Sequence, residues 1–307
     1  MKCMLCSSDN PRLLFVAQDI HGRQILSNDK FDIFQCDACN VAFTQVHVGP
    51  EYYKKYYRKD YYCPINSNGL IGKCLFFLQE FSFKKRLKLI ERYKSSKGNR
   101  ILEVGCAKGE FLNSLPESYD KCAVEINEDG YNFVKENYKN IDIHNVRIND
   151  RDFKASKFGE FDVIIMWHVF EHVEDPAVFI DNLSKLLAKD GVLIFDIPNK
   201  DSLGFNLTQH WWFHLDAPRH LFHYNYKSID SLIQRSKLKI VGHVGNIWDY
   251  PQDLPASFYS KFKTANFILN SLFFIFVLPV LTIFRFIVAL FFSKKAEINT
   301  YIAKRAN

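Results

Sequence analysis

The middle of the chain alternates short apolar runs with longer segments of helical periodicity. Four runs have the length and β-branched content of buried strands: RILEVG (100–105), KCAVEI (121–126), FDVIIMW (161–167) and GVLIFDIP (191–198). The segment 176–191 begins with Pro and ends with Gly, which predicts a helix over that range. Strands that alternate with helices predict an α/β fold with a Rossmann-like, doubly wound, mostly parallel sheet. KIVGHV (239–244) adds a further strand.

A long apolar stretch lies close to the C-terminus, at residues 267–292. As one helix it would be about 39 Å long, enough to cross a bilayer core of about 30 Å. Two residues argue against a single crossing. Pro279 would break the helix in its middle, and Arg285 would lie deep in the membrane. Lysines flank the stretch on both sides: Lys261, Lys263, Lys294 and Lys295.

With 48% hydrophobic and 24% charged residues, the composition is that of a globular protein, and 307 residues exceed one ordinary domain. We expect a cysteine-bearing region at 1–48, a Tyr-rich and helical connector at 49–97, and a main domain at 98–307 with an apolar insert at 261–295. Lysines and arginines are spread along the chain, so we expect no nucleic-acid partner. The one basic run is interpreted as a solvated helix face: Lys84, Lys85, Arg86 and Lys88.

The cysteines predict a metal site. No signal peptide opens the chain, because MKCMLC has no apolar segment behind it, so we expect reduced thiols and a cytoplasmic location. The pairs Cys3–Cys6 and Cys36–Cys39 both have the spacing Cys-x-x-Cys. Four such thiolates form a closed tetrahedral site, which predicts a structural zinc. Unrelated cysteines and a redox pair are the alternatives, although a redox Cys-x-x-Cys usually stands alone before a helix.

The segment EVGCAKGEF (103–111) follows the first strand and is the strongest sign of a ligand site. Gly105 and Gly109 allow a tight turn and a close approach of the backbone to a ligand. A dinucleotide fingerprint would read G-x-G-x-x-G, whereas here Glu103 precedes the first glycine. An acid there repels a pyrophosphate and attracts the cationic amino-acid end of S-adenosylmethionine (SAM).

Glu125 ends the second predicted strand. An acid at this point of a Rossmann-like sheet accepts hydrogen bonds from ribose hydroxyls. Either acid alone could be an ordinary charge at a strand end. Together, Glu103 and Glu125 favour a SAM site.

These motifs make the chain resemble the class I SAM-dependent methyltransferases, especially the group with ubiquinone O-methyltransferases and polysaccharide-cluster enzymes. The resemblance covers about residues 99–245 and includes ILEVGCAKGEF, AVEI, FDVIIMWHVFEHVEDP, DGVLIFDIPN and WWFHLDAPRHLFHY. Ala107 departs from the family, which usually has Gly there. The N-terminal cysteine pairs and the Tyr-rich stretch at 51–63 resemble those of sugar-modifying methyltransferases, so this stretch is expected to help cover the substrate.

The resemblance implies that the segment after FDVIIMW flanks the cofactor. Trp167 and His168 would lie beside the adenosine and the methyl group, and the segment with Glu171 and His172 would begin the next helix. A helix-capping role for Glu171 and His172 is the alternative.

The loop WWFHLDAPRHLFHY (211–224) would face the substrate, because ligands of doubly wound sheets lie outside the carboxyl ends of the strands. Imidazole is the natural proton acceptor near neutral pH. The resemblance makes His220 the preferred base, ahead of His172 and His168, with Asp216 or Glu171 to orient it. A packed aromatic lid with incidental histidines is the alternative.

The resemblance also implies that EINTYIAKR (297–305) is an antiparallel last strand next to KIVGHV. The apolar stretch between them then leaves the sheet and returns to it, so a helical hairpin bent near Pro279 and embedded in one leaflet is expected. A buried hairpin or a dimer interface is the alternative. We therefore expect a cytoplasmic enzyme on the inner face of the membrane.

The sequence thus predicts a SAM-dependent methyltransferase that O-methylates a glycan or a lipid-linked envelope precursor. Methylation of a quinone or other lipid ring, and C-methylation of a sugar, are alternatives within this class. A non-catalytic SAM-binding module that recruits partners to the membrane, and a structural zinc protein with a degenerate enzyme domain, belong to different classes. Glu103, Gly105, Gly109 and Glu125 argue against degeneration.

Overall fold

A computed structural model of the chain describes residues 1–21, 24–57, 69–96 and 98–306. The chain divides into two compact units. The first comprises Met1–Arg58, Ile197–Ser231 and His243–Thr300, and the second comprises Lys59–Asp196, Leu232–Gly242 and Tyr301–Asn307. Three strands contribute residues to both units: β8 (Leu187–Pro198), β10 (Leu238–Gly245) and β11 (Ile298–Arg305).

The larger sheet contains these three strands and four others: β4 (Arg100–Val104), β5 (Asp120–Val124), β6 (Ile141–His144) and β7 (Phe161–Trp167). Its order is β10-β11-β8-β7-β4-β5-β6, and the pairs β4–β5, β5–β6, β4–β7 and β7–β8 are parallel. Beside β11, the amide of Asn246 donates to the carbonyl of Ile298 (2.9 Å), and that of Ala306 donates to Lys237 (2.8 Å). This pattern is antiparallel. The predicted α/β fold, with its antiparallel last strand, is confirmed.

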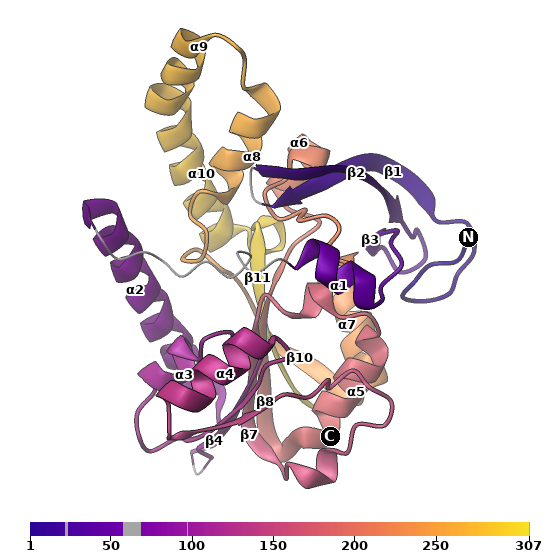
Figure 1. The fold of residues 1–307 in the computed structure, drawn as a ribbon, viewed down its shortest axis with the longest axis vertical. Coiled ribbons are helices and arrows are strands. Elements are labelled where there is room, and N and C mark those ends of the chain that lie inside the picture. Colours follow the sequence, from indigo (N-terminus) through magenta and orange to yellow (C-terminus); the bar gives the residue numbers. More distant parts are fainter. Residues whose placement is uncertain (22–23, 58–68, 97, 307) are drawn as a thin grey trace. The chain divides into compact units, whose positions relative to one another are not determined.

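Helices cover both faces of the sheet in the second unit (Figure 1). On one face lie α2 (Gly69–Tyr93), α3 (Glu110–Ser114) and α4 (Glu128–Asn137), whose apolar side chains share a core with strand residues such as Ile101 and Val163. On the other face lies α5 (Pro176–Leu186). Two short helical turns, η1 (Ala155–Lys157) and η2 (Phe170–His172), connect strands and helices, and α7 (Tyr226–Arg235) is shared by the two units.

Two local predictions in this region are wrong. The predicted helix 176–191 ends at Leu186, because the chain enters β8 at Leu187. Gly191 is not a helix cap. A Cβ there would lie 2.9 Å from the carbonyl oxygen of Phe161, so glycine serves the close approach of β8 to β7. The segment with Glu171 and His172 forms only the turn η2, and Asp175 caps α5 by accepting the amide of Val178 (3.2 Å).

The first unit has its own antiparallel sheet, in the order β1-β2-β3-β9. Its strands are β1 (Arg12–His21), β2 (Gln24–Gln35), β3 (Ala42–Thr44) and β9 (Phe222–His223), and α1 (Pro50–Tyr56) follows β3. The core under this sheet joins Ile20 and Ile33 to Phe205 and Trp212. The cysteine-bearing segment therefore shares both a sheet and a core with the segment 205–224.

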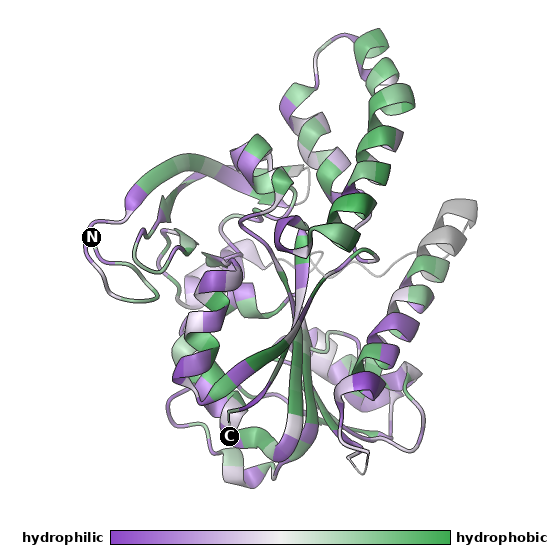
Figure 2. Cartoon of the chain, turned by 180° about the vertical axis from the view of Figure 1, so that it is seen from behind, coloured by the Kyte–Doolittle hydropathy of each residue, from purple (hydrophilic) through white to green (hydrophobic). Residues whose placement is uncertain are grey.

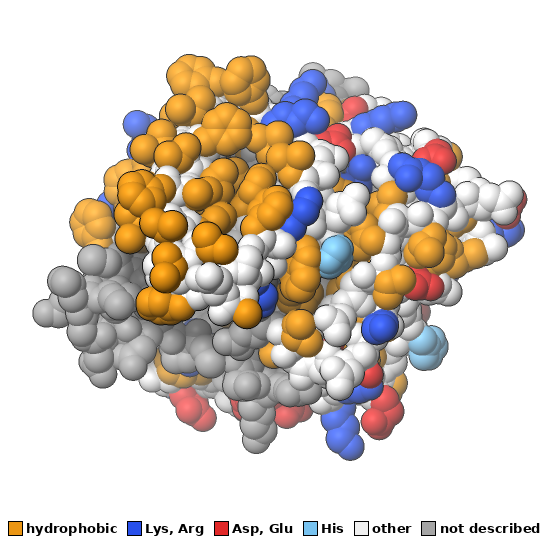
Figure 3. Space-filling view, turned by 90° about the horizontal axis from the view of Figure 1, so that it is seen from above, with side chains coloured by type: hydrophobic (Ala, Val, Ile, Leu, Met, Phe, Trp, Pro, Cys, Tyr) orange, Lys and Arg blue, Asp and Glu red, His pale blue; other side chains and the backbone are white. Residues whose placement is uncertain are grey.

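The remaining helices of the first unit include the apolar stretch. They are α6 (Leu203–Thr208), η3 (Gln209–Trp211), α8 (Asp253–Phe262), α9 (Phe267–Leu272), the π-helical turn η4 (Phe273–Val277), α10 (Leu278–Phe291) and η5 (Ser293–Lys295). From α9 to α10 the chain forms one helix, Phe267–Phe291, which we call the apolar helix. Within the described residues it is the one helix that is long and apolar enough to cross a membrane. Figure 2 shows its hydrophobic colouring along its length, and Figure 3 shows the apolar side chains gathered there.

The predicted hairpin within the apolar stretch is wrong, because residues 267–291 form one helix. A different hairpin is present, between α8 and the apolar helix. The rings of Tyr259 and Phe273 lie 5.6 Å apart, and Arg285 bonds to Asp253, so α8 and the apolar helix are antiparallel and the turn falls at residues 263–266. The expected bend at Pro279 is wrong. Pro279 occupies the first turn of α10, directly after the π-helical turn, where a missing amide proton is tolerated.

Candidate functional site

The turn after β4 has the backbone geometry of a close ligand approach. Gly105, Ala107 and Gly109 have positive φ values of 72°, 50° and 69°. A Cβ on Gly105 would lie 2.5 Å from a methyl carbon of Val169, so no other residue fits without movement. At Ala107 the left-handed conformation costs about 1–2 kcal/mol, a cost that glycine would not carry.

Glu125 holds this turn against the end of β5. One carboxylate oxygen accepts the amide of Ala107 and the other accepts the amide of Asn127, both at 2.8 Å. Burial raises the pKa of Glu125, although these amide bonds oppose the shift. Each oxygen can accept a second hydrogen bond, so both retain the capacity to bind ribose hydroxyls.

Glu103 is a buried carboxyl group that needs a positive partner. Its side chain lies at the end of β4 with 3% of the residue exposed, and its Oε2 has no hydrogen-bond partner among the residues that the structure describes. Burial raises the pKa of Glu103 to about 8, a shift that Arg86 opposes and Glu125 reinforces. The group is therefore ready to ionise when a cation, such as the ammonium of SAM, lies beside it.

Arg86 of α2 belongs to this cluster and was missed by the sequence analysis, which placed it on a solvated face. Lys84, Lys85 and Lys88 are exposed as expected. The guanidinium of Arg86 instead lies over the ring of Trp167, 4.3 Å from its centre, and 3.9 Å from a carboxylate oxygen of Asp196. A guanidinium in this place is suited to the carboxylate of an amino acid.

The segment after β7 carries the other predicted residues of the second unit. Trp167 ends the strand, and its Nε1 has no hydrogen-bond partner within the described part of the chain. His168 has a positive φ of 55°, and its amide donates to the carbonyl of Asp196 (3.1 Å). Its Nδ1 lies 3.7 Å from a carboxylate oxygen of the buried Glu171, and His172 follows in η2. The structure thus brings the predicted cofactor residues and two of the three histidines into one unit.

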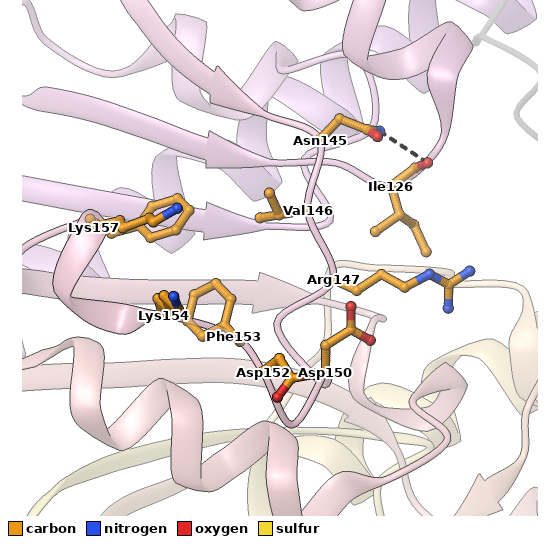
Figure 4. Close-up of a pocket in the computed structure, with 10 residues that line it drawn as sticks. Ile126, Asn145, Val146, Arg147, Asp150, Asp152, Phe153, Lys154 and Lys157 are labelled. Atoms are coloured by element: carbon orange, nitrogen blue, oxygen red, sulfur yellow. Dashed lines mark hydrogen bonds between the residues drawn. The ribbon is translucent and has the colours of Figure 1, made fainter.

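A pocket of about 530 Å³ adjoins this cluster, and the sequence analysis did not foresee it. Its walls come from Ile126, which follows Glu125, and from the loop after β6. Four of the lining side chains are apolar (Ile126, Val146, Phe153, Phe158), and the other six are polar or charged (Asn145, Arg147, Asp150, Asp152, Lys154, Lys157). Asn145 fixes one edge by donating to the carbonyl of Ile126 at 3.2 Å (Figure 4). A flat ring with a polar edge suits such a lining.

His220, the preferred base, lies in the first unit, in the loop before β9. Its Nδ1 donates to the carbonyl of His214 (2.8 Å), and its Nε2 lies 3.6 Å from Asp216. Arg219, which is fully buried, bonds both Asp216 and Asp19 at 2.9 Å. Asp216 therefore lies between the guanidinium of Arg219 and the ring of His220.

A second histidine faces Asp216 and was not foreseen. Nδ1 of His21, at the end of β1, lies 2.9 Å from the carboxylate, and its side chain is 48% exposed. Burial alone would raise the pKa of Asp216, but the bond from His21 and the charges of His220 and Arg219 hold it well below its usual range. No spacing in the sequence relates residues 19–21 to 216–220; only the fold does.

The four predicted zinc ligands lie together in the first unit. The sulfur atoms of Cys3 and Cys39 are 3.7 Å apart, and those of Cys6 and Cys36 are 3.6 Å apart. Zinc–sulfur bonds of about 2.3 Å in a tetrahedron place the sulfurs about 3.8 Å apart. In each pair the residue after the second cysteine, Ser7 or Asn40, has a φ of 60° and donates its amide to the first cysteine's carbonyl. Two equivalent turns therefore present four thiols to one point.

The comparisons with known proteins agree with this geometry. A family model described as "Methyltransferase domain" matches residues 77–243, more than half of the chain. The chain belongs to this methyltransferase family. The predicted membership of a methyltransferase family is confirmed.

The chain is also similar to ubiquinone biosynthesis O-methyltransferases. The one from Psychrobacter cryohalolentis is 30% identical over 115 residues, 34% of this chain and 42% of the relative. The one from Methylococcus capsulatus is 25% identical over 126 residues, 40% and 53% of the two chains. The chain thus spans about half the length of the curated relatives that it matches, or less.

Among solved structures, StiE O-MT (residues 961–1257) shares the fold with a TM-score of 0.51 and 13% identity, over 78% of this chain and 79% of that one. A chain of the complex between the Haloferax volcanii Trm112 methyltransferase activator and a methyltransferase has a TM-score of 0.50 and 9% identity, over 75% and 92%. These likenesses concern the fold.

We predict that SAM affinity depends on pH through Glu103. Because its pKa of about 8 exceeds the ordinary value of 4.5, the carboxyl is protonated at pH 5.5 and ionises as the pH rises, so affinity for the ammonium rises as the pH approaches about 8. Glu103→Gln should flatten this slope and weaken binding at the upper pH by about 1.5–3 kcal/mol. Calorimetry across this range measures both effects. Glu110→Gln, the same change on the exposed side of α3, is the control, and an unchanged slope in Glu103→Gln would contradict the assignment.

Proposed function

We propose that this methyltransferase transfers the methyl group of SAM to a hydroxyl oxygen of a glycan or lipid-linked envelope precursor at the inner face of the membrane. One observation carries the membrane part of the proposal. The exposed apolar helix belongs to the same compact unit as residues 211–224, which we call the histidine loop. The histidine loop, which would contact the acceptor, and the surface that would face the membrane then belong to one folded unit.

The cofactor residues fit SAM group by group. Glu103 would bind the ammonium and Arg86 the carboxylate of its amino-acid end, with Gly105, Ala107 and Gly109 allowing close approach. Glu125 would bind the ribose hydroxyls, and the pocket beside Ile126 would hold the adenine. Trp167 would lie beside the adenosine. SAM supplies the methyl group on a sulfonium, and the protein supplies the orientation.

His220 would remove the proton of the acceptor hydroxyl through Nε2, because Nδ1 is committed to the carbonyl of His214. The excess negative charge of Asp19 and Asp216 over Arg219 would stabilise the imidazolium that forms. His172 and His168 are the other candidates in this role.

The apolar helix would lie flat in the membrane surface rather than across the bilayer. Its 25 residues expose large apolar side chains along their length, from Phe267 (82% exposed) to Phe291 (74%). Lysines are exposed beyond both ends: Lys261, Lys263, Lys294 and Lys295. A helix of this length is about 37 Å long, and a flat orientation brings both groups of lysines to the anionic headgroups of one leaflet. Arg285 does not oppose this orientation, because it points into the protein.

The cysteine cluster would hold one structural zinc ion with Cys3, Cys6, Cys36 and Cys39 as ligands. Four sulfurs complete the tetrahedral shell and leave no position for substrate, so the ion would act on the fold alone.

Methylation of a quinone or another lipid ring is the second candidate. It is favoured by the name of the relatives, which are ubiquinone biosynthesis O-methyltransferases. It fits the membrane-facing helix equally well, because such an acceptor also lies in the bilayer.

We predict that loss of the gene removes the mass of one CH2 group from an envelope glycan or lipid, or from a quinone, as mass spectrometry of the two extracts will show. On that acceptor, His220→Ala should lower turnover about 100-fold, the usual contribution of a positioned base, and leave SAM affinity intact. His210→Ala, on an exposed histidine of the same segment, is the control. If His172→Ala abolishes turnover and His220→Ala does not, His172 is the base.

We predict one zinc ion per chain, lost when Cys36 and Cys39 are both replaced by Ser, because two thiolates cannot complete the site. Metal analysis of protein purified under reducing conditions measures it. Cys122→Ser, at a buried cysteine of β5, should keep the metal. Fresh wild-type protein without metal would overturn the assignment.

We predict that the wild-type protein sediments with vesicles that contain phosphatidylglycerol, and that Ile275→Glu with Ile283→Glu lowers the bound fraction at least about tenfold. Each exposed isoleucine would contribute about 1.5–3 kcal/mol on burial. Val241→Glu, at an exposed apolar residue of β10, is the matched control. A chain that ignores vesicles but dissociates from a dimer on the double substitution would show that a second copy covers the helix. Deleting residues 264–293 is a poorer test, because it removes Arg285 and leaves Asp253 buried without its guanidinium partner.

A further inference from the structure

One charged side chain interrupts the apolar helix, and it points into the protein. Arg285 is 2% exposed. Its Nε and Nη2 bond the two carboxylate oxygens of Asp253 at 2.5 and 3.0 Å. Its Nη1 donates to the carbonyl of Ile247 (3.1 Å), and Nη2 also donates to that of Asp249 (2.7 Å). A single guanidinium thus ties the middle of α10 to the start of α8 and to the loop before it.

Asp253 also connects Arg285 to the histidine loop. The same oxygen that accepts Nη2 of Arg285 lies 3.1 Å from Nε2 of His214, and both side chains are buried. Ser257, one turn further along α8, accepts the amide of Phe213 (2.9 Å), which fixes the residue before His214. The side chain and the backbone of the loop are therefore both held by α8.

His214 in turn fixes the candidate base. Its carbonyl accepts Nδ1–H of His220 at 2.8 Å, which sets the tautomer and the ring plane of that imidazole. A chain of buried hydrogen bonds within one compact unit therefore leads from the apolar helix to the histidine loop. Its members are Arg285, Asp253, His214 and His220.

We propose that Arg285 is a positioning residue, through which docking of the apolar helix on a bilayer orders the loop that carries His220. This inference rests on the proposed membrane association. In water, little of the helix is anchored, since of α10 only Arg285, Val288 and Ala289 are buried. Contact with lipid restrains the helix along its exposed face, and the buried bonds carry that restraint to residues 212–221.

Hydrogen exchange followed by mass spectrometry tests this, with and without vesicles of phosphatidylcholine and phosphatidylglycerol. In the wild type, vesicles should slow exchange in the apolar helix and, by about threefold or more, in residues 212–221. Arg285→Lys keeps the charge but loses the forked bond to Asp253, so it should bind vesicles and slow exchange in the helix alone. Thr282→Ala is the matched control on the same helix. The hydroxyl of Thr282 donates to the carbonyl of Leu278 in the same helix (2.9 Å), and this variant should behave as the wild type.

Each outcome decides the matter. Wild-type vesicle binding without slower exchange in 212–221, or an equal effect in Arg285→Lys, overturns the coupling and leaves membrane association standing. A wild-type protein that does not sediment with vesicles overturns both. If Arg285→Lys fails to fold, Asp253→Asn, which retains one acceptor oxygen for Arg285 and weakens the tie to His214, replaces it and should show the same loss of coupling.

Discussion

The backbone hydrogen bonds that hold β11 in the sheet constrain everything that the chain does between residues 246 and 297. Asn246 bonds to Ile298 at the start of β11, and the amide of Asn199, which follows β8, donates to Glu297 (2.8 Å). The segment 246–297, which contains the apolar helix, therefore leaves the sheet and returns to it beside β11. A single crossing would require residues 246–266 to cross the bilayer as well, and these include the buried, charged Asp253. The topology, more than the hydropathy, argues against a single crossing by the apolar helix.

Two buried arginines organise the unit around the histidine loop. Arg219 joins Asp19 of β1 to Asp216 of the loop, and Arg285 joins the apolar helix to Asp253. A buried guanidinium is costly to desolvate and is retained only where several acceptors meet it with good geometry. Each arginine thus selects one arrangement of segments that are distant in the sequence. Specific positioning of the loop is the function that best accounts for this cost.

Much of the fold was readable from the sequence, because the buried strands are continuous apolar runs and the motif around Gly105 dictates a turn. The strand β6 was missed because IDIH is short and half polar, as suits an edge strand. The helix at 176–191 was overextended because the sequence does not show that Gly191 meets a neighbouring strand. The partners of Arg86 and Arg285 could not be predicted from the sequence for a different reason. Whether an arginine faces solvent, lipid or a carboxylate depends on contacts that only the folded chain creates.

The same reasoning changes how the cysteine cluster relates to catalysis. The sequence predicts a separate cysteine-bearing region at 1–48, in which a metal ion would only stabilise the fold of that region. In the structure, Cys36 follows β2, β3 pairs with β9, and the hydroxyl of Thr44 donates to the carbonyl of His220 (2.7 Å). A zinc ion that fixes the end of β2 would therefore also fix the strand against which His220 is held. Loosening the cluster should disturb the loop before it unfolds the sheet around the cofactor turn, because β1, β2, β3 and β9 form a sheet of their own.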